Sequence, residues 1–473
     1  MAEARKPMTV CTYGFNVPCR RFLIAANVTR DKRLPVVDEF YLRVLKLCER
    51  VPVRRLGSYF GFSETEAEIV TADLAARGLI EVEGDTVALH PSAHEHFRAG
   101  DDDVPRITEI ETWVEHVWFD LVSQNIMPAD RTRTSKNLAD IKPDDVAREM
   151  PALFARRAFE QNFTEYLRNV RRIGDPARFG LYSISDVQAG GFGFVVVKGR
   201  DDLLLDPQPK LDPHLLEVEI GNVARFRPLS DALWDAYRRF TGPAASTAAL
   251  SDYVRLTGDE TVTGGHDKKG FFDIAAWLDR QGGTGNPDRQ PVVGATYIDR
   301  NIAFFVKMLE ARGLSGLPRD KPRDLELVWF RPTGTTWGTS PDLEASISSI
   351  KGAVRHTLSR AWRVRTSLVV PQVSRGENNK RFEGLFDRAC LATGGYLSPA
   401  VEVMLLRGVG AIVTVCVRLS AVIVVPVGFT IIDPVAVAAL ENALQLELVD
   451  EFHQLWRHAM EDDEEAIAVE SGV

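Results

Sequence analysis

The chain has few cysteines and no long uninterrupted apolar run. Its five cysteines are scattered and form no Cys-x-x-Cys pair, so the sequence predicts neither a disulfide framework nor a zinc ribbon. Arg20 and Arg21 interrupt the first apolar stretch, which excludes a typical signal peptide. The most apolar segment, residues 409–432, is divided by Arg418, and its uncharged part, residues 419–432, contains Pro426 and is too short for a spanning helix. We therefore expect a cytoplasmic protein without membrane contact, cofactor or metal.

The chain also lacks an excess of positive charge. In 473 residues, 57 Lys and Arg stand against 66 Asp and Glu, which gives a net charge of -9. No field of the whole protein attracts nucleic acid, so any such contact must be local. Hydrophobic residues at 45% and charged residues at 26% are ordinary for packed globular domains. The excess of arginine over lysine, 44 to 13, is typical of GC-rich bacterial genomes.

The N-terminal hundred residues have the clearest pattern. Residues 8–28 form two short apolar runs around Asn16, Val17 and Pro18, which predicts a hairpin or arm. Helical spacing of apolar residues over 36–50 and a short segment 53–60 predict two helices. Ser63 followed by Glu66 is a capping-box pattern that begins a third helix, and alternation over 79–89 predicts a two-stranded wing.

These elements, and the segment LGSYFGFSETEAEIVTADLAARGLIEVEGDTVALHP, resemble the winged helix-turn-helix family over residues 36–98. In that family the third helix enters the DNA major groove with basic or amide side chains exposed. Here the third helix presents Glu64, Glu66, Glu68 and Asp73, and the whole segment has a net charge of -4. We therefore expect this module to dock a protein partner or another part of the chain, while contact with nucleic acid through another face stays open.

The rest of the chain predicts a mixed α+β and α/β multidomain protein. Residues 1–35 are expected to be the N-terminal arm, 99–143 a linker with a helix over 108–123, and 144–245 a region of helices and strands. Residues 246–473 alternate strands and helices, which predicts an α/β layer domain. Its expected helices include 342–359, 379–391 and a long last helix from Asp433 to Trp456.

The order of a strand, Asp433-Pro434 and a long helix resembles the C-terminal end of phospholipase-D-like domains. His266, Lys268 and Asp273 also match the His-x-Lys-x4-Asp spacing of that family. The resemblance implies that His266 attacks phosphorus and Lys268 binds phosphate oxygens. Gly283-Thr284-Gly285-Asn286 departs from the family's following motif, and the alternative is a surface loop before an ordinary helix. With one motif copy, catalysis would need a homodimer.

The largest local excess of positive charge lies between residues 351 and 381. Eight basic residues occur there with Glu377 as the one acid. They are Lys351, Arg355, Arg360, Arg363, Arg365, Arg375, Lys380 and Arg381, with Trp362 between them. Cations with an interleaved aromatic ring are typical of surfaces that follow a phosphate backbone. The alternative is a set of ion pairs with acidic surface elsewhere in this protein.

Three functions follow from these observations. The first is a nucleic-acid-associated regulatory or bacterial defence-system component, not an enzyme by itself, that docks a protein through the winged module and contacts DNA or RNA through the basic segment. The second is a phosphodiesterase or nuclease centred on His266, Lys268 and Asp273. The third is a structural adaptor that binds no nucleic acid. An oligomer is compatible with each.

Overall fold

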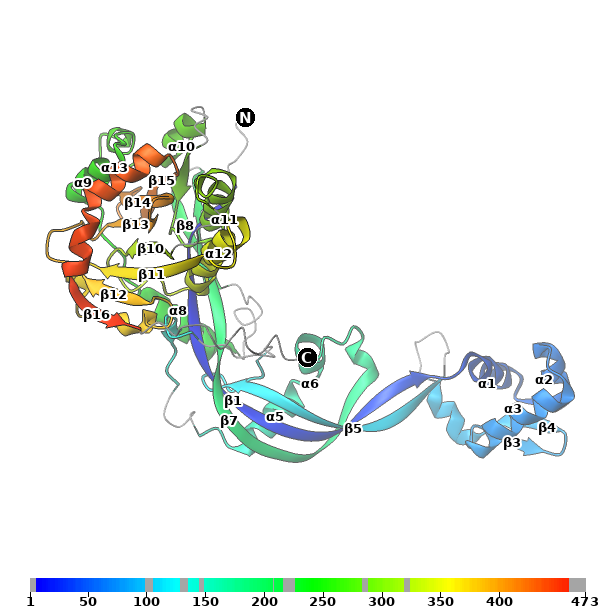
Figure 1. Cartoon of the computed structure of the whole chain (residues 1–473). Helices are drawn as coiled ribbons and strands as arrows, with labels where there is room; N and C mark the ends of the chain where they lie inside the picture. The colour runs from blue at the N-terminus through cyan, green and yellow to red at the C-terminus, as the bar shows by residue number, and fades with distance from the viewer. Residues whose placement is uncertain are drawn as a thin grey trace, which may run out of the picture. The chain divides into compact units, whose positions relative to one another are not determined.

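The structure is a computed structural model and describes residues 6–97, 105–127, 135–143, 149–206, 208–215, 226–282, 288–318 and 324–458. The chain divides into two compact units (Figure 1). Unit 1 comprises Met1–Pro18, Thr132–Pro143 and Phe194–Val473, and unit 2 comprises Cys19–Arg131 and Asp144–Gly193. Helices and several sheets occur together, which confirms the predicted mixed multidomain class.

Unit 1 contains an eight-stranded sheet. In spatial order its strands are β16 (His453–Arg457), β12 (Arg388–Leu391), β11 (Arg363–Val370), β10 (Asp324–Phe330), β13 (Val401–Leu406), β14 (Gly410–Arg418), β15 (Val424–Ile431) and β9 (Arg289–Val293). Strands β10, β11 and β12 run parallel, and every other neighbouring pair is antiparallel.

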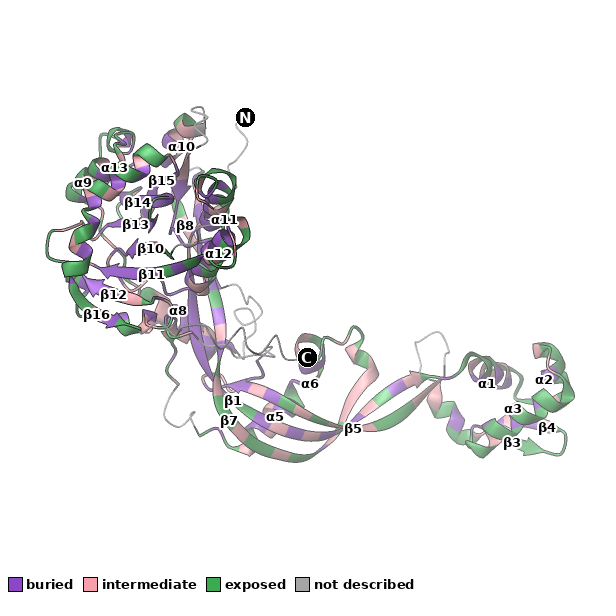
Figure 2. Ribbon diagram, viewed as in Figure 1, coloured by how far each residue is buried: buried purple, intermediate pink, exposed green. Residues whose placement is uncertain are grey.

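Helices cover both faces of this sheet (Figures 1 and 2). Helices α11 (Asp299–Met308) and α12 (Pro341–Thr357) pack on one face, and α9 (Thr247–Thr257), α10 (Ile274–Gly282) and α13 (Pro434–Leu444) on the other. Successive residues of β10 alternate between the two cores: Trp329 is in one and Val328 and Phe330 are in the other. A strand buried on both faces is apolar throughout, which explains the continuous apolar runs. Helix α8 (Arg227–Arg238) also belongs to unit 1.

A second sheet contains two unusually long strands. Its order is β5 (Arg106–Asp120), β1 (Met8–Arg33), β7 (Phe179–Leu204) and β8 (Lys210–Leu215), and β6 (Ala139–Asp140) pairs with β1. In unit 2 this sheet packs against α5 (Ala152–Gln161), α6 (Phe163–Glu165) and a π-helical turn, Tyr166–Val170. Their shared core includes Phe22, Phe119, Phe159 and Tyr166.

The predicted turn at Asn16 to Pro18 is wrong, because β1 continues through it. Phe15 and Asn16 pair with β6, whereas pairing with β5 begins at Cys19. Pro18 therefore falls where one neighbouring strand replaces another, a position that tolerates the missing N–H of proline.

Residues 36–97 form a module inserted between β1 and β5, whose ends pair at Arg33 and Arg106. We call it the winged-helix module after the resemblance expected from its sequence. It contains α1 (Val36–Cys48), α2 (Val53–Phe60), α3 (Glu64–Ala76) and a sheet of order β2 (Arg50–Pro52), β4 (Thr86–Leu89), β3 (Ile80–Glu83). The predicted capping box is confirmed: the Glu66 N–H donates to Ser63 Oγ over 3.3 Å, and the Ser63 N–H donates to Glu66 Oε2 over 2.9 Å.

Three predicted helices are corrected. Residues 108–123 lie mainly in strand β5, because the β-branched and aromatic residues of this segment pair with β1. Residues 379–391 form a 3-10 turn, Asn379–Phe382, and then β12. The last helix ends at Leu444, after which Gln445 adopts a left-handed conformation with φ 48° and the chain continues to β16. Trp456 is thus on a strand, and its indole N–H donates to the Phe386 carbonyl over 3.0 Å.

Strands β10, β11, β13 and β14 lie on apolar runs of residues 246–473, the region in which strands and helices were expected to alternate. Residues 144–148, the start of the expected 144–245 region, and the Gly283–Asn286 motif lie outside the described residues. Within the residues that the structure describes, no helix combines the length and apolarity needed to cross a bilayer.

Candidate nucleic-acid interface

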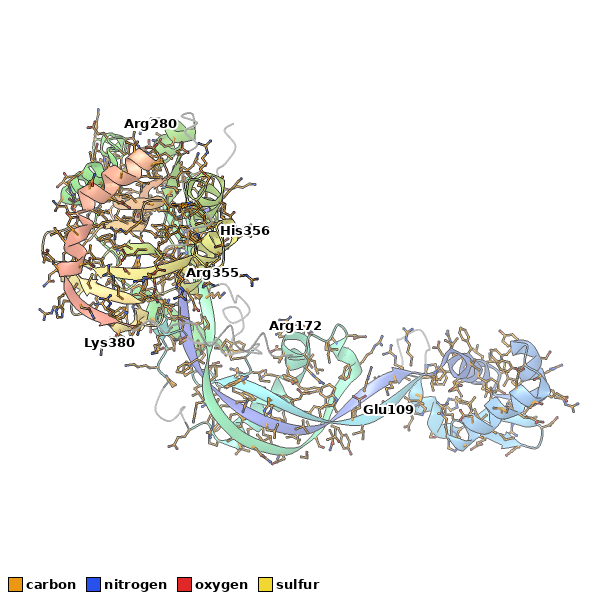
Figure 3. All side chains as sticks on the ribbon, viewed as in Figure 1. Glu109, Arg172, Arg280, Arg355, His356 and Lys380 are labelled. Atoms are coloured by element: carbon orange, nitrogen blue, oxygen red, sulfur yellow. The ribbon has the colours of Figure 1, made fainter. Side chains whose placement is uncertain are left out.

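Four of the eight basic residues lie where α12 ends and β11 begins. Lys351 and Arg355 are one helical turn apart, so they share a face of α12. A surface hollow at this end of α12 is lined by Gly352, Arg355, His356 and Arg360. Arg363 is the first residue of β11. We call Lys351, Arg355, Arg360 and Arg363 the α12 patch. Figure 3 labels Arg355 and His356 on this helix.

The α12 patch is not neutralised by neighbouring acids. None of its four side chains forms an ion pair or a hydrogen bond with any residue in the described ranges. The carboxylates of α12, Asp342 and Glu344, are in its first turn, at the opposite end of the helix. This distribution suits the helix dipole, which favours cations at the C-terminal end. Two acids lie beside the patch: Glu310 is 3.9 Å from His356 Nδ1, and Asp324, which is opposite Arg363 in the pairing of β10 with β11, forms an ion pair with Arg365.

Glu377, the one acid in the basic segment, has a different partner. Arg331 is 2% exposed, and its guanidinium pairs with the Glu377 carboxylate and donates to Asn379 Oδ1 over 2.7 Å. Arg331 directly follows β10, so this pair lies beyond the C-terminal ends of the parallel strands. Glu377 therefore compensates a buried cation and does not neutralise the α12 patch.

The other four basic residues do not join the patch. Arg365 pairs with Asp324. Arg381 donates to Thr339 Oγ1 over 2.6 Å and to the Trp337 carbonyl over 3.0 Å, and burial lowers the pKa of its guanidinium to about 10. Arg375 and Lys380 are exposed but follow the C-terminal end of β11, and Figure 3 draws Lys380 well away from Arg355. The predicted continuous basic segment is thus divided between the two ends of one strand.

Trp362 is corrected as well. Its side chain is 0% exposed and packs in the core between α12 and the sheet. A buried indole offers no face to a nucleobase, so the expectation of a stacking ring is wrong. Contact at the α12 patch would be limited to phosphate oxygens.

Sequence reasoning missed a neighbouring charged hollow of about 460 Å³ at the start of β10, β11 and β12. At its centre Glu326 accepts from Arg388 over 2.7 Å and from Arg407 over 2.9 Å. These arginines are compensated and add no free cation to the patch. The clustering could not be inferred, because Arg388 was expected on a helix and not at the start of a strand.

The α3 side of the winged-helix module is acidic. Arg77, the one basic residue near the end of α3, pairs with Asp38 over 2.6 Å and Asp73 over 3.0 Å. A groove of about 800 Å³ next to α2 and α3 includes Glu64, Glu68 and Asp85 of the wing among its lining residues, together with Arg54, which pairs with Glu64 over 3.4 Å. Carboxylates at this face oppose phosphate binding.

The His266, Lys268 and Asp273 side chains do not interact with one another. His266 Nδ1 lies 3.1 Å from the Thr263 carbonyl, and Asp273 Oδ1 accepts from the Ala276 N–H at the start of α10 over 2.9 Å. No hydrogen bond joins the three side chains within the described ranges. No group of three or more potential metal ligands occurs in the same part of the chain.

No family model matches the chain, and no curated protein is significantly similar to it. Among solved structures, one of an archaeal protein is similar at 12% identity, over 54% of this chain and 77% of that one, with a TM-score of 0.21. Its description reads "Structure of TrmBL2, an archaeal chromatin protein, shows a novel mode of DNA binding". The TM-score is too low to place both chains in one fold. None of these findings supports the resemblance to phospholipase-D-like domains.

Proposed function

We propose that this protein is a nucleic-acid-associated regulatory component that contacts phosphate groups through the α12 patch and docks a protein partner through the α2–α3 face of its winged-helix module. The observation that carries the first part is a group of four cations that have no carboxylate partner among the described residues, in a chain of net charge -9. Such cations gain most when they replace the counterions of a polyanion. Because Trp362 is buried, the contact is expected to be independent of base sequence.

The first test is neutralisation of the patch in the full chain. We expect Lys351→Gln/Arg355→Gln/Arg360→Gln/Arg363→Gln to weaken binding of a fluorescent DNA or RNA duplex at least ~10-fold at low salt, measured by anisotropy. Arg375→Gln/Lys380→Gln is the matched control, because these exposed cations lie at the other end of β11. Equal affinity of the wild type and the fourfold variant, or an equal loss in the control, contradicts the proposal.

The second part is supported by the acidic groove of the module. Three acids against the one cation Arg54, which pairs with Glu64, leave the groove acidic and favour a partner surface that presents Lys or Arg. Neighbouring apolar side chains such as Ile69 and Val82 are exposed. We expect Glu64→Lys/Glu68→Lys to lose a protein that co-purifies with the wild type from its native host. Glu49→Lys/Glu95→Lys, on exposed acids outside the groove, should retain it. Retention by the groove variant, or no co-purifying protein with the wild type, would exclude docking at this face.

A further inference from the structure

Unit 1 contains a cavity of about 400 Å³ that none of the predicted site residues lines. Its walls come from the beginning of β1, the β7–β8 pair, the segment after α8, the segments after β9 and β10, and strands β13 to β15. This volume is within the range of small-molecule sites, about 300–1,000 Å³. Most of the lining is apolar or aromatic, including Val10, Phe240, Pro332 and Val425.

A buried acid fixes one wall of the cavity. Glu402 Oε1 accepts from the indole N–H of Trp337 over 2.7 Å, from that of Trp329 over 2.9 Å and from Thr296 Oγ1 over 2.6 Å. Because these three donors share one oxygen, the Glu402 carboxylate already has hydrogen-bond partners within the protein. It holds the Trp337 ring at the cavity wall and so contributes a preorganised aromatic surface.

A second acid at the wall, Asp201, has no Lys or Arg partner in the described ranges. Asp201 is 8% exposed, lines the cavity and accepts from the Tyr237 hydroxyl over 3.0 Å. The adjacent Asp202 takes the cationic partner: Asp202 Oδ2 accepts from Arg200 Nε over 2.9 Å, and Asp202 Oδ1 accepts from Thr9 over 2.7 Å. No Lys or Arg in the described ranges forms an ion pair with Asp201. Burial raises the pKa of the Asp201 carboxyl to about 6, and the groups that lower this pKa are the Tyr237 and Tyr13 hydroxyls and the charge of His214.

The cavity wall also contains a hydroxyl without a partner. Thr414 is 1% exposed, and its Oγ1 makes no hydrogen bond within the described part of the chain. A buried hydroxyl without a partner is costly, and a polar ligand atom would relieve that cost. The cavity thus combines a carboxylate that has no Lys or Arg partner in the described ranges and an unused hydroxyl with apolar and aromatic walls.

We propose that this cavity binds a small primary amine with an apolar body, whose ammonium group pairs with Asp201 while the body packs against Trp337 and Phe240. An ammonium group supplies the charge that Asp201 lacks and gains further from aromatic faces. A carboxylate ligand would be repelled by Asp201. A neutral alcohol would leave the buried acid without a counter-charge.

The test compares three probes that share one apolar body and differ in the head group. Isothermal titration of the full chain at neutral pH is carried out with 2-phenylethylamine, 2-phenylethanol and 3-phenylpropanoate. The amine is expected to bind at least ~10-fold more tightly than either other probe. Equal or tighter binding of the alcohol or the carboxylate overturns the proposal, as does the absence of amine binding at millimolar concentration.

The Asp201→Asn variant tests whether the ammonium group of the ligand pairs with Asp201. We expect this variant to weaken amine binding about 10-fold and to leave 2-phenylethanol binding unchanged, and the second measurement also reports that the cavity is intact. Asp212→Asn is the matched control, because Asp212 is a half-buried carboxylate on β8 that does not line the cavity. Unchanged amine binding in Asp201→Asn contradicts the proposal, and the amine comparison in the wild type decides it independently of this variant.

Discussion

Glu402 is a carboxylate in the core of unit 1, 3% exposed, with two indole N–H donors and one hydroxyl donor on the same oxygen. Burial raises the pKa of Glu402 above its ordinary value of 4.5, although the three donors oppose this shift. Burial raises the pKa values of Tyr297, Cys11 and Cys416, and the charge of Glu402 in turn raises them further. The folded state therefore binds the Glu402 proton more tightly than the unfolded state.

This difference predicts a pH dependence of stability. A raised pKa in the folded state stabilises the fold at low pH, and the contribution is lost as pH rises above about 4.5. Glu402→Gln keeps an oxygen acceptor but cannot ionise. We expect the free energy of unfolding of Glu402→Gln, relative to that of the wild type, to increase from pH 4 to pH 7 in urea titrations. A constant or decreasing difference would show that the donors, and not burial, control the Glu402 pKa.

At the scale of elements, Gly428 in β15 allows two buried strands to approach closely. It pairs with Thr414 in β14, and a Cβ on Gly428 would lie 1.9 Å from the Val413 carbonyl oxygen. That oxygen belongs to the backbone of the neighbouring strand and has no room to move. The absence of a side chain is thus required by the pairing of β14 with β15.

Gly428→Ala should separate these strands and lower the free energy of unfolding by at least about 2 kcal/mol. Gly316→Ala serves as the control, because no atom lies within 4 Å of its added Cβ, and it should change stability by less than about 0.5 kcal/mol. Denaturant titration of both variants provides the measurement. Similar stabilities would mean that β14 and β15 tolerate a wider spacing.

Elements were predictable from the sequence where local chemistry decides the structure. The capping residues Ser63 and Asp433 mark the starts of α3 and α13, and buried strands such as β10 are continuous apolar runs. Prediction failed where a neighbouring strand decides. The apolar spacing of residues 108–120 and 388–391 also fits a helix. These residues form strands because they pair with β1 and β11.

The candidate interface was predictable in part for a related reason. The sequence identifies which residues are charged, and the spacing on α12 places Lys351 and Arg355 on one face. The sequence does not show that Arg375 and Lys380 lie beyond the C-terminal end of β11, away from the α12 patch. Nor does it show that Glu377 pairs with Arg331. The cavity beside Asp201 was not predictable, because segments near residues 11, 201, 240, 297, 337 and 414 meet only in the folded unit. The geometry of the described residues does not support the role in bacterial defence that was expected from the combination of modules.

At the scale of the whole molecule, the distribution of charge matters more than its sum. The chain has a net charge of -9, and most arginines in the described ranges of unit 1 pair with acids or are buried, as Arg365, Arg388 and Arg331 show. The α12 patch brings four cations without acidic partners among the described residues together at one end of α12, so nucleic-acid affinity should depend on these four cations and on ionic strength, and only weakly on base sequence.

The most direct test of this account is the salt dependence of duplex DNA binding. If four phosphates are contacted, the slope of log K against log salt concentration is expected to be about -3.6 for the wild type, since each phosphate contributes about -0.9. The fourfold Gln variant should lose most of this slope, and Arg375→Gln/Lys380→Gln should keep it. A wild-type slope near zero, or an unchanged slope in the fourfold variant, would contradict phosphate contact at the α12 patch.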